Sequence, residues 1–270
     1  MYAIIKLGDD MERFINILRT HMTEPKPFGW FHIMWLLLSF ITIFILYKFK
    51  NKYNEKQLKT VLGIYGIIVF ILELLKQISW AYDLDKHIWS FSWYSSPFQL
   101  CTMPIYISLI CLFLKKTKLR DYLLSFICFY TILGSISAMI MPESCFVSEI
   151  LINIHTMYLH CGSFVLSIYL LMNEIKPTKE NLLGAFKVFI VCIILALTLD
   201  ITFYKSGIIG DSTFNMFFIS PYFESTLPVF SIIYKKVPYI IFLCSYIVLL
   251  TLGASIIFLI PKFINKKTQD

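Results

Sequence analysis

The chain has 270 residues, of which 58% are hydrophobic and only 15% are charged, and its mean hydropathy is +0.72. Since a soluble domain carries about 25% charged residues, this composition excludes an ordinary soluble protein and indicates one that crosses a membrane several times. The net charge of +7 requires no nucleic-acid partner, because basic loops beside an anionic inner leaflet account for it.

The apolar stretches predict an all-α fold, a polytopic bundle of seven transmembrane helices. Runs of about 20 apolar residues span a bilayer core when they are helical. Their continuous apolar character excludes barrel strands, which alternate. In chain order, the predicted spans cover residues 30–47, 61–79, 97–114, 122–140, 151–172, 184–203 and 238–260.

The two ends of the chain differ from this pattern. Apolar residues of the segment 1–29 fall on one helical face, which predicts an amphipathic helix at the membrane interface. Pro25 and Pro27 then interrupt the chain. We therefore expect an N-terminal segment (1–29), a transmembrane domain (30–262) and a basic cytoplasmic tail (263–270).

Basic residues alternate between the loops. They are concentrated in the first, third and fifth loops and in the tail; the third loop holds Lys115, Lys116, Lys118 and Arg120. The positive-inside rule then places the N-terminus outside and the C-terminus in the cytoplasm. We expect a multi-pass protein of the cell membrane whose partners are membrane lipids, with an ordered outer cap at 204–237. The oligomeric state is left open.

Among the seven cysteines, Cys101 stands apart. No CxxC pair occurs, so we expect no metal site, no cofactor and no disulfide framework. Cys101 opens the third predicted span, and Pro104 should loosen the helix there. A thiol near a helix N-terminus is favoured as thiolate. The alternative is a small packing residue.

The fifth span carries two histidines. His160 lies about 13 Å of helix rise below the predicted outer end of the span, whereas His155 is expected at the membrane interface. An ionisable group at that depth either serves a function or bonds a neighbouring helix, and both interpretations are open for His160.

Other polar residues favour the same outer half of the bundle. Glu73, Lys76 and Gln77 share one helical face, so the Glu73–Lys76 pair could neutralise itself or Glu73 could orient His160. We predict a single site, in which the candidate substrate-binding residues are Gln77, Gln99, Asp200 and Asn215.

Four short motifs carry a family resemblance. They lie at 96–101 (Ser-Pro-Phe-Gln-Leu-Cys), 133–142 (Leu-Gly-Ser through Met-Pro), 154–160 (Ile-His through Leu-His) and 215–221 (Asn-Met-Phe-Phe with Pro221). In this order and spacing they resemble the YwaF family of bacterial integral membrane proteins. That family is similar to an animal multipass acyltransferase, transmembrane protein one-six-four, which remodels ether phospholipids.

The resemblance implies a thiol-dependent acyltransferase or hydrolase that acts on lipid esters, with Cys101 as nucleophile and His160 as base. Glu73 is a candidate third catalytic member. The alternative is a proton- or ion-coupled transporter, or a membrane protein that binds a small molecule without catalysis. In that case Glu73, Lys76 and His160 would form an ionisable site. A scaffold without site chemistry is the third possibility, so the sequence leaves open whether the protein is an enzyme.

Overall fold

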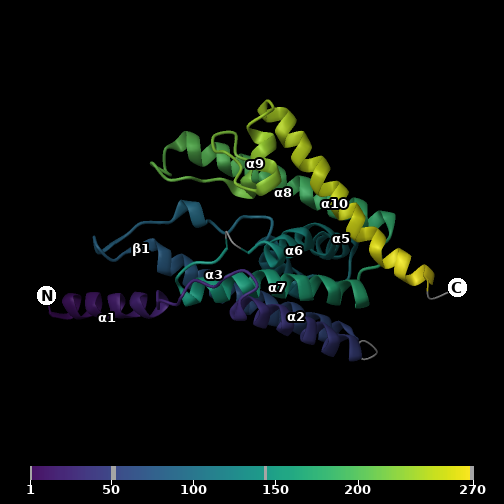
Figure 1. The fold of residues 1–270 in the computed structure, drawn as a ribbon, viewed down its shortest axis with the longest axis horizontal. Coiled ribbons are helices and arrows are strands. Elements are labelled where there is room, and N and C mark those ends of the chain that lie inside the picture. Colours follow the sequence, from purple (N-terminus) through teal and green to yellow (C-terminus); the bar gives the residue numbers. More distant parts are fainter. Residues whose placement is uncertain (1, 50–52, 143–144, 268–270) are drawn as a thin grey trace.

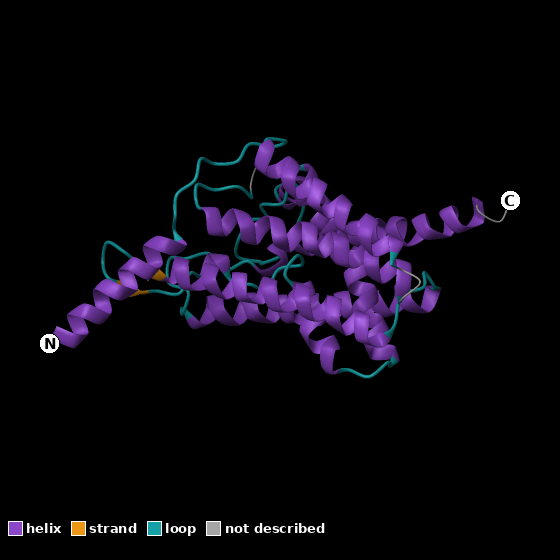
Figure 2. Ribbon diagram, turned by 90° about the horizontal axis from the view of Figure 1, so that it is seen from below, coloured by secondary structure: helices purple, strands orange, loops and turns teal. Residues whose placement is uncertain are grey.

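The computed structural model describes residues 2–49, 53–142 and 145–267, which are almost entirely helical (Figures 1 and 2). The α-helices are α1 (Tyr2–Leu18), α2 (Trp30–Lys48), α3 (Glu55–Ala81), α4 (Met103–Phe113), α5 (Lys118–Phe126), α6 (Ile132–Ile140), α7 (Ile150–Asn173), α8 (Lys179–Ser206), α9 (Pro228–Tyr234) and α10 (Tyr239–Lys267). The shorter elements are β1 (Tyr82–Asp83), β2 (Ile88–Trp89), η2 (Trp93–Ser95), η3 (Ile127–Thr131) and η4 (Met216–Phe218). The predicted all-α class is confirmed.

Six helices are long and apolar enough to cross a membrane. They are α2, α3, the continuous helix Lys118–Ile140, α7, α8 and the part of α10 that ends at Pro261. These helices coincide with six of the seven predicted spans, so the multi-pass membrane architecture is confirmed. The side of the membrane on which each terminus lies stays a prediction.

The third predicted span, 97–114, is different. Its helix α4 contains only 11 residues, about 16 Å of rise, because the chain before it forms turns. Pro104 lies in the first turn of α4, where a missing N–H costs nothing. The described residues therefore form six full spans and one short apolar helix, and the count of seven spans stays a prediction.

The segment η3 lies at the centre of the packing. It is a short π-helix between α5 and α6, and all five of its residues are buried. It contacts α4, α7, α8 and α10, so it joins the two sides of the bundle. The Ser167 hydroxyl of α7 donates to the Ile127 carbonyl at 3.1 Å, which gives that backbone group a partner from another helix.

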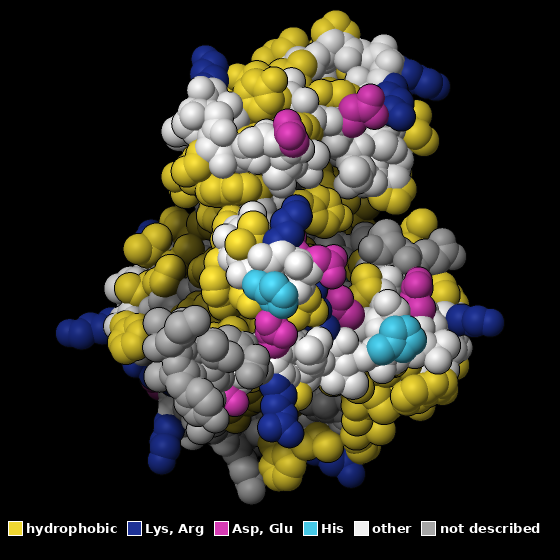
Figure 3. Space-filling view, turned by 90° about the vertical axis from the view of Figure 1, so that its left-hand side faces the viewer, with side chains coloured by type: hydrophobic (Ala, Val, Ile, Leu, Met, Phe, Trp, Pro, Cys, Tyr) yellow, Lys and Arg dark blue, Asp and Glu magenta, His cyan; other side chains and the backbone are white. Residues whose placement is uncertain are grey.

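The bundle has two sides. Figure 1 shows α8, α9 and α10 on one side and α2, α3 and α7 on the other, with α5 and α6 between them. Seen from the end that carries α1 and β1, the molecule narrows to a waist, and acidic, basic and histidine side chains gather just below it (Figure 3). The outer faces are apolar; for example, Leu37, Phe40 and Phe44 of α2 are more than half exposed, as expected for contact with lipid.

The helix α1 packs on the end of α3. The Arg19 guanidinium donates to the Ser79 carbonyl at 2.6 and 3.1 Å and to the Tyr82 carbonyl at 2.9 Å. Ile15 is fully buried in the same contact. The N-terminal segment is thus helical, and its place at the membrane interface stays a prediction. Residues 268–270 of the predicted tail lie outside the described residues.

The predicted outer cap contains a buried loop, residues 214–219, which includes η4. Phe214, Met216, Phe217 and Ile219 are at most 3% exposed. Phe217 and Phe218 have φ angles of 54° and 58°, in the left-handed region that bulky residues rarely adopt. Each such residue costs about 1–3 kcal/mol, so neighbouring elements must hold this loop in place.

Candidate functional site

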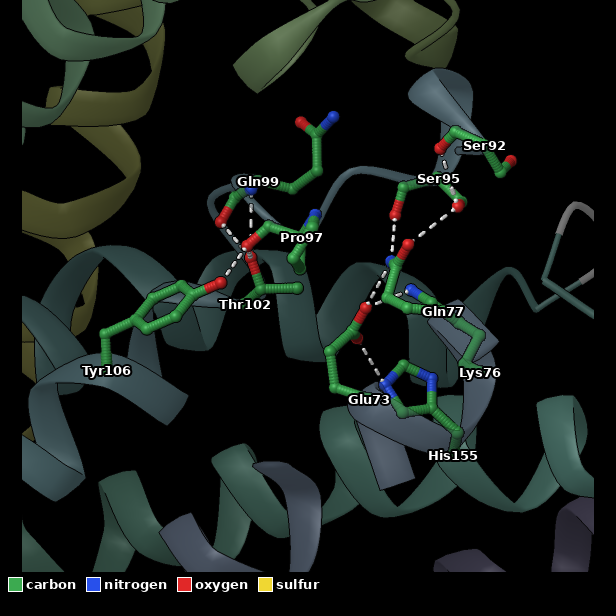
Figure 4. A network of polar contacts seen from close by, with 10 residues as sticks. All are labelled: Glu73, Lys76, Gln77, Ser92, Ser95, Pro97, Gln99, Thr102, Tyr106 and His155. Carbon is green, nitrogen blue, oxygen red and sulfur yellow. Dashed lines mark hydrogen bonds and ion pairs between the residues drawn. The ribbon is translucent and has the colours of Figure 1, made fainter. Parts of the chain in front are cut away.

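Cys101 lies in a tight turn between η2 and α4, residues 97–102, called here the Cys101 turn. Figure 4 shows Pro97, Gln99 and Thr102 of this turn. The Thr102 hydroxyl oxygen lies 2.8 Å from the Pro97 carbonyl and 2.9 Å from the Gln99 carbonyl, and it accepts the Gln99 N–H at 2.9 Å. The Tyr106 hydroxyl also donates to the Pro97 carbonyl, at 2.7 Å. The turn is therefore fixed from within, and it leaves Cys101 partly exposed.

A cluster of buried ionisable side chains, the Glu73 cluster, joins α3 to α7 (Figure 4). Glu73 Oε1 lies 2.7 Å from Lys76 Nζ and accepts from Gln77 Nε2 at 2.8 Å, and Glu73 Oε2 lies 2.7 Å from His155 Nε2. The side chains of Glu73 and His155 are 6% and 4% exposed. The close Glu73–Lys76 pair confirms that these two groups can neutralise each other.

His155 is the residue whose role the sequence interpretation missed. His155 is 3% exposed and contacts Glu73, so it faces the protein interior, and its expected depth at the membrane interface stays a prediction. His160 lies five residues further along α7, so its side chain leaves the helix about 140° away from that of His155. Glu73 consequently contacts His155 and forms no hydrogen bond with His160; both residues lie in the described part of the chain. The signal in the sequence was the carboxylate of Glu73 inside a spanning helix, because such a group needs polar partners on a neighbouring helix.

The Glu73 cluster is connected through Gln77 to Ser95, the last residue of η2, which lies just before the Cys101 turn. Gln77 Nε2 donates to the Ser95 carbonyl at 2.7 Å, and the Ser95 hydroxyl donates back to Gln77 Oε1 at 3.3 Å. Glu73 and Lys76 also lie close enough to Cys101 to act on it electrostatically. The sequence prediction thus grouped Glu73, Gln77 and Cys101 in a region where the structure also brings them together.

His160 is not hydrogen-bonded to Cys101 in the described structure, and Tyr65 of α3 packs against the same helix, α7, that carries His160. The Tyr65 hydroxyl is 2.6 Å from Ser163 Oγ, and its ring packs against α7 at Gly162, where an added Cβ would lie 3.0 Å away. Tyr65 is also within electrostatic range of Cys101. The Nδ1 atom of His160 is buried without a hydrogen-bond partner in the described parts of the chain, so it is available to a neighbouring group.

The remaining predicted residues surround the buried loop. Gln99 Nε2 donates to the Asn215 carbonyl at 2.9 Å, and Asp200 Oδ1 accepts the Met216 N–H at 2.8 Å. The Asn215 side chain bonds its own loop, accepting from Ser220 N–H at 2.9 Å and donating to the Glu224 carbonyl at 3.0 Å. These contacts connect Gln99, Asp200 and Asn215 to one another through the loop, and their part in substrate binding stays a prediction.

A second buried charged cluster, the Arg120 cluster, was not foreseen from the sequence. Arg120, which was counted among the basic residues of the third loop, is fully buried. Its Nη1 lies 2.5 Å from Glu55 Oε1 and its Nη2 lies 2.7 Å from Glu174 Oε1. Tyr53 donates to Glu174, and Lys116 Nζ lies 3.3 Å from the same carboxylate. The signal was the presence of acidic residues, among them Glu55 and Glu174, in otherwise basic loops.

Burial opposes the charged form of Glu174, but the Tyr53 hydroxyl and the charges of Lys116 and Arg120 outweigh it, so the pKa of Glu174 lies below its usual value. Burial and then the bond to Glu174 raise the pKa of Tyr53, which therefore stays protonated. Among the described residues, no group of three or more His, Cys, Asp or Glu side chains could hold a metal ion.

The comparisons with known proteins give one match. A family model described as the TMEM164 family matches residues 27–258. The comparison with curated proteins and that with solved structures each found no match. The matched range covers five full spans and most of the sixth, and it includes the Cys101 turn, the Glu73 cluster and the buried loop. The chain therefore belongs to the TMEM164 family of membrane proteins.

Proposed function

We propose that this protein is a membrane-embedded, thiol-dependent acyltransferase or hydrolase that acts on lipid esters, and that it belongs to the YwaF type within its family. Cys101 is the nucleophile and His160 is the base. The observation that carries the proposal is the Cys101 turn. It holds Cys101, a residue that is only partly buried, outside the regular helix and beside the buried ionisable groups of Glu73 and Lys76. The resemblance of the sequence motifs implies the same two residues.

The proposed reaction has two steps, acylation of the thiol and transfer of the acyl group. His160 takes the thiol proton, the Cys101 sulfur attacks the ester carbonyl, and the lyso-lipid oxygen leaves with the proton that His160 returns. The acyl group is then held as a thioester. A lyso-lipid hydroxyl or a water molecule, deprotonated by His160, attacks the thioester, and the Cys101 thiol is restored.

The backbone of the Cys101 turn can stabilise the oxyanion formed in each step. In the described parts of the chain, the N–H groups of Leu100 and Cys101 donate to no other residue. A tetrahedral intermediate requires backbone donors beside the nucleophile that bond no other residue, and the Cys101 N–H bonds only its own sulfur. Thr102 and Tyr106 hold the carbonyls of the same turn, so these donors are already oriented before substrate binds.

The contact between His160 and Cys101 must form when substrate is bound. A base and its nucleophile often come within hydrogen-bond distance only in the substrate complex. His160 Nδ1 has no competing partner within the described structure, so a side-chain rotation is not opposed by a bond that must break. Glu73 acts less directly, because it holds His155 and Gln77 and through Gln77 the start of the loop that carries Cys101.

The test is acyl transfer from an ester phospholipid by the full chain in lipid nanodiscs. Cys101→Ala should abolish transfer, and His160→Ala should lower it by about 10²–10⁴-fold, the usual contribution of a general base. Cys244→Ala and His87→Ala are the matched controls, because both residues are exposed and lie outside this site. Full transfer in folded Cys101→Ala protein would rule the proposal out.

A second candidate function, a proton- or ion-coupled transporter, is favoured by one observation. Glu73, Lys76 and His155 are three ionisable groups buried together between two spanning helices, as in many coupling sites. This alternative predicts that Glu73→Gln abolishes ion-dependent uptake into proteoliposomes whereas Cys101→Ala leaves uptake unchanged. The enzyme proposal predicts no such uptake in either protein.

A further inference from the structure

We propose that Gln99 and Asp200 are positioning residues that clamp a single peptide group, and that this clamp holds the Cys101 turn in its reactive arrangement. The inference deepens the proposed function and rests on it for the reaction that the clamp serves. The contacts of the clamp itself do not depend on that reaction.

The clamped group is the peptide bond between Asn215 and Met216. Its carbonyl accepts from Gln99 Nε2 at 2.9 Å, and its N–H donates to Asp200 Oδ1 at 2.8 Å. The carbonyl and N–H of a trans peptide point in opposite directions, and this bond is trans. Gln99 from the Cys101 turn and Asp200 from α8 therefore hold the same peptide from its two sides.

The buried loop needs such support. Phe217 and Phe218, directly after the clamped peptide, have positive φ angles, a strained conformation that persists only when surrounding contacts impose it. The Tyr239 hydroxyl of α10 donates to the Ile219 carbonyl at 2.7 Å and so anchors the far end of the loop. The loop is thus held by α8, by α10 and by the Cys101 turn.

The clamp acts on Cys101 through the residues that precede it. Gln99 stands two positions before Cys101, and its own N–H bonds Thr102, one position after Cys101. The Phe98 ring packs on Phe217 with centroids 5.8 Å apart. A shift of the clamped peptide must therefore move the backbone on both sides of the thiol.

The unused atoms of the clamp also suggest a functional role. Gln99 Oε1 and Asp200 Oδ2 are both buried and have no hydrogen-bond partner in the described parts of the chain. A buried acceptor without a hydrogen-bond partner is unfavourable. A contact that served stability alone could be made by side chains that lack these two atoms. The pattern fits a region in which geometry at the thiol takes precedence over stability.

The experiment measures two quantities in the full chain in nanodiscs: the rate at which a water-soluble maleimide alkylates Cys101, followed on the Cys101 peptide by mass spectrometry, and the rate of acyl transfer. Gln99→Glu keeps the size of the side chain but replaces the donor with an acceptor. Asp200→Leu removes the acceptor. Each should change Cys101 alkylation about tenfold and lower acyl transfer, as expected for the loss of one buried hydrogen bond.

Two further variants make the test specific to the clamp. Asp200→Asn keeps an acceptor for the Met216 N–H and should restore both rates. The double variant Gln99→Glu/Asp200→Leu should differ little from either single variant, because both residues act on one peptide group. Thr198→Val, an exposed position of α8 that bonds only its own helix, is the control.

Unchanged Cys101 alkylation in folded Gln99→Glu and Asp200→Leu proteins would overturn the clamp, as would fully additive effects in the double variant. The failure of the proposed function is recognised separately. In that case Cys101→Ala keeps acyl transfer, while the alkylation rates of the clamp variants still report whether Gln99 and Asp200 position the turn.

Discussion

The two buried charged clusters of this protein occupy opposite ends of the same helices, and they are built differently. Glu55 of the Arg120 cluster and Glu73 of the Glu73 cluster are 18 positions apart on α3, which corresponds to about 27 Å of rise. The Arg120 cluster joins one buried guanidinium to two carboxylates and lies at loop–helix junctions. The Glu73 cluster instead lies beside a thiol, and the turn that carries this thiol contacts the strained loop.

This difference separates the residues that stabilise the bundle from those that serve the proposed reaction. In the Arg120 cluster, every charged group is matched by an opposite charge, so its role is to join α3, α5 and α7. In the Glu73 cluster, the charges are connected through Gln77 to Ser95, just before the turn that presents a reactive group. Variants in the two clusters can distinguish a cluster that holds the bundle together from one that serves a reaction.

The largest expected effect on stability is at Arg120. Arg120→Met removes a fully buried cation and leaves the carboxylate of Glu174, which is 2% exposed, without its main partner. Breaking a buried pair in this way costs about 3–5 kcal/mol. The unfolding temperature measured in detergent should fall strongly. Glu73→Gln, which keeps an amide in place of the carboxylate, should lower acyl transfer with a smaller loss of stability. If Glu73→Gln were the more destabilising change, the distinction between the clusters would be wrong.

A medium effect is expected from packing at two glycines. A Cβ at Gly184 of α8 would lie 2.0 Å from a ring atom of Tyr122, whereas a Cβ at Gly134 of α6 would lie 3.9 Å from Cys101 Cβ, an ordinary contact. Gly184→Ala should therefore destabilise the protein by about 1–3 kcal/mol. Gly134→Ala should leave the unfolding temperature nearly unchanged but alter the alkylation rate of Cys101. Equal thermal stability of the two variants would contradict this packing.

The smallest effect is the pH dependence of the Arg120 cluster. Because the folded-state pKa of Glu174 is depressed, the stabilisation from its ionised form is complete above the unfolded pKa of about 4.5 and is lost as the pH falls through the folded value. Unfolding measured from pH 6 downwards should show stability declining below about pH 4.5. Glu174→Gln should flatten that part of the profile. An unchanged profile in the variant would assign the acid sensitivity to other carboxylates.

The sequence predicted the long helices well because hydropathy depends on local composition alone. It placed six spans correctly and predicted the α1 helix and the ordered cap. It overextended the third span, because the hydrogen bonds of Thr102 and Tyr106 that turn the chain before α4 are specific side-chain contacts. Apolar composition does not reveal them.

Individual contacts of the site were predictable only where the two residues are close in sequence. Glu73, Lys76 and Gln77 share a helix face, and their mutual contacts were confirmed. The contact between Glu73 and His155 joins residues 82 positions apart, so helical periodicity carried no signal for it. The same holds for Arg120, whose partners lie 54 and 65 positions away. Each of these contacts depends on how the helices pack.

The most direct test of the central claim is to look for the acyl group on the thiol. The full chain in nanodiscs is mixed with a phospholipid whose ester-linked acyl chain carries an isotopic label, quenched in acid, digested and analysed by mass spectrometry. The account predicts a labelled, hydroxylamine-sensitive adduct on the Cys101 peptide that is absent from Cys101→Ala protein. Turnover of the lipid with no acyl group on Cys101 at any time would contradict it.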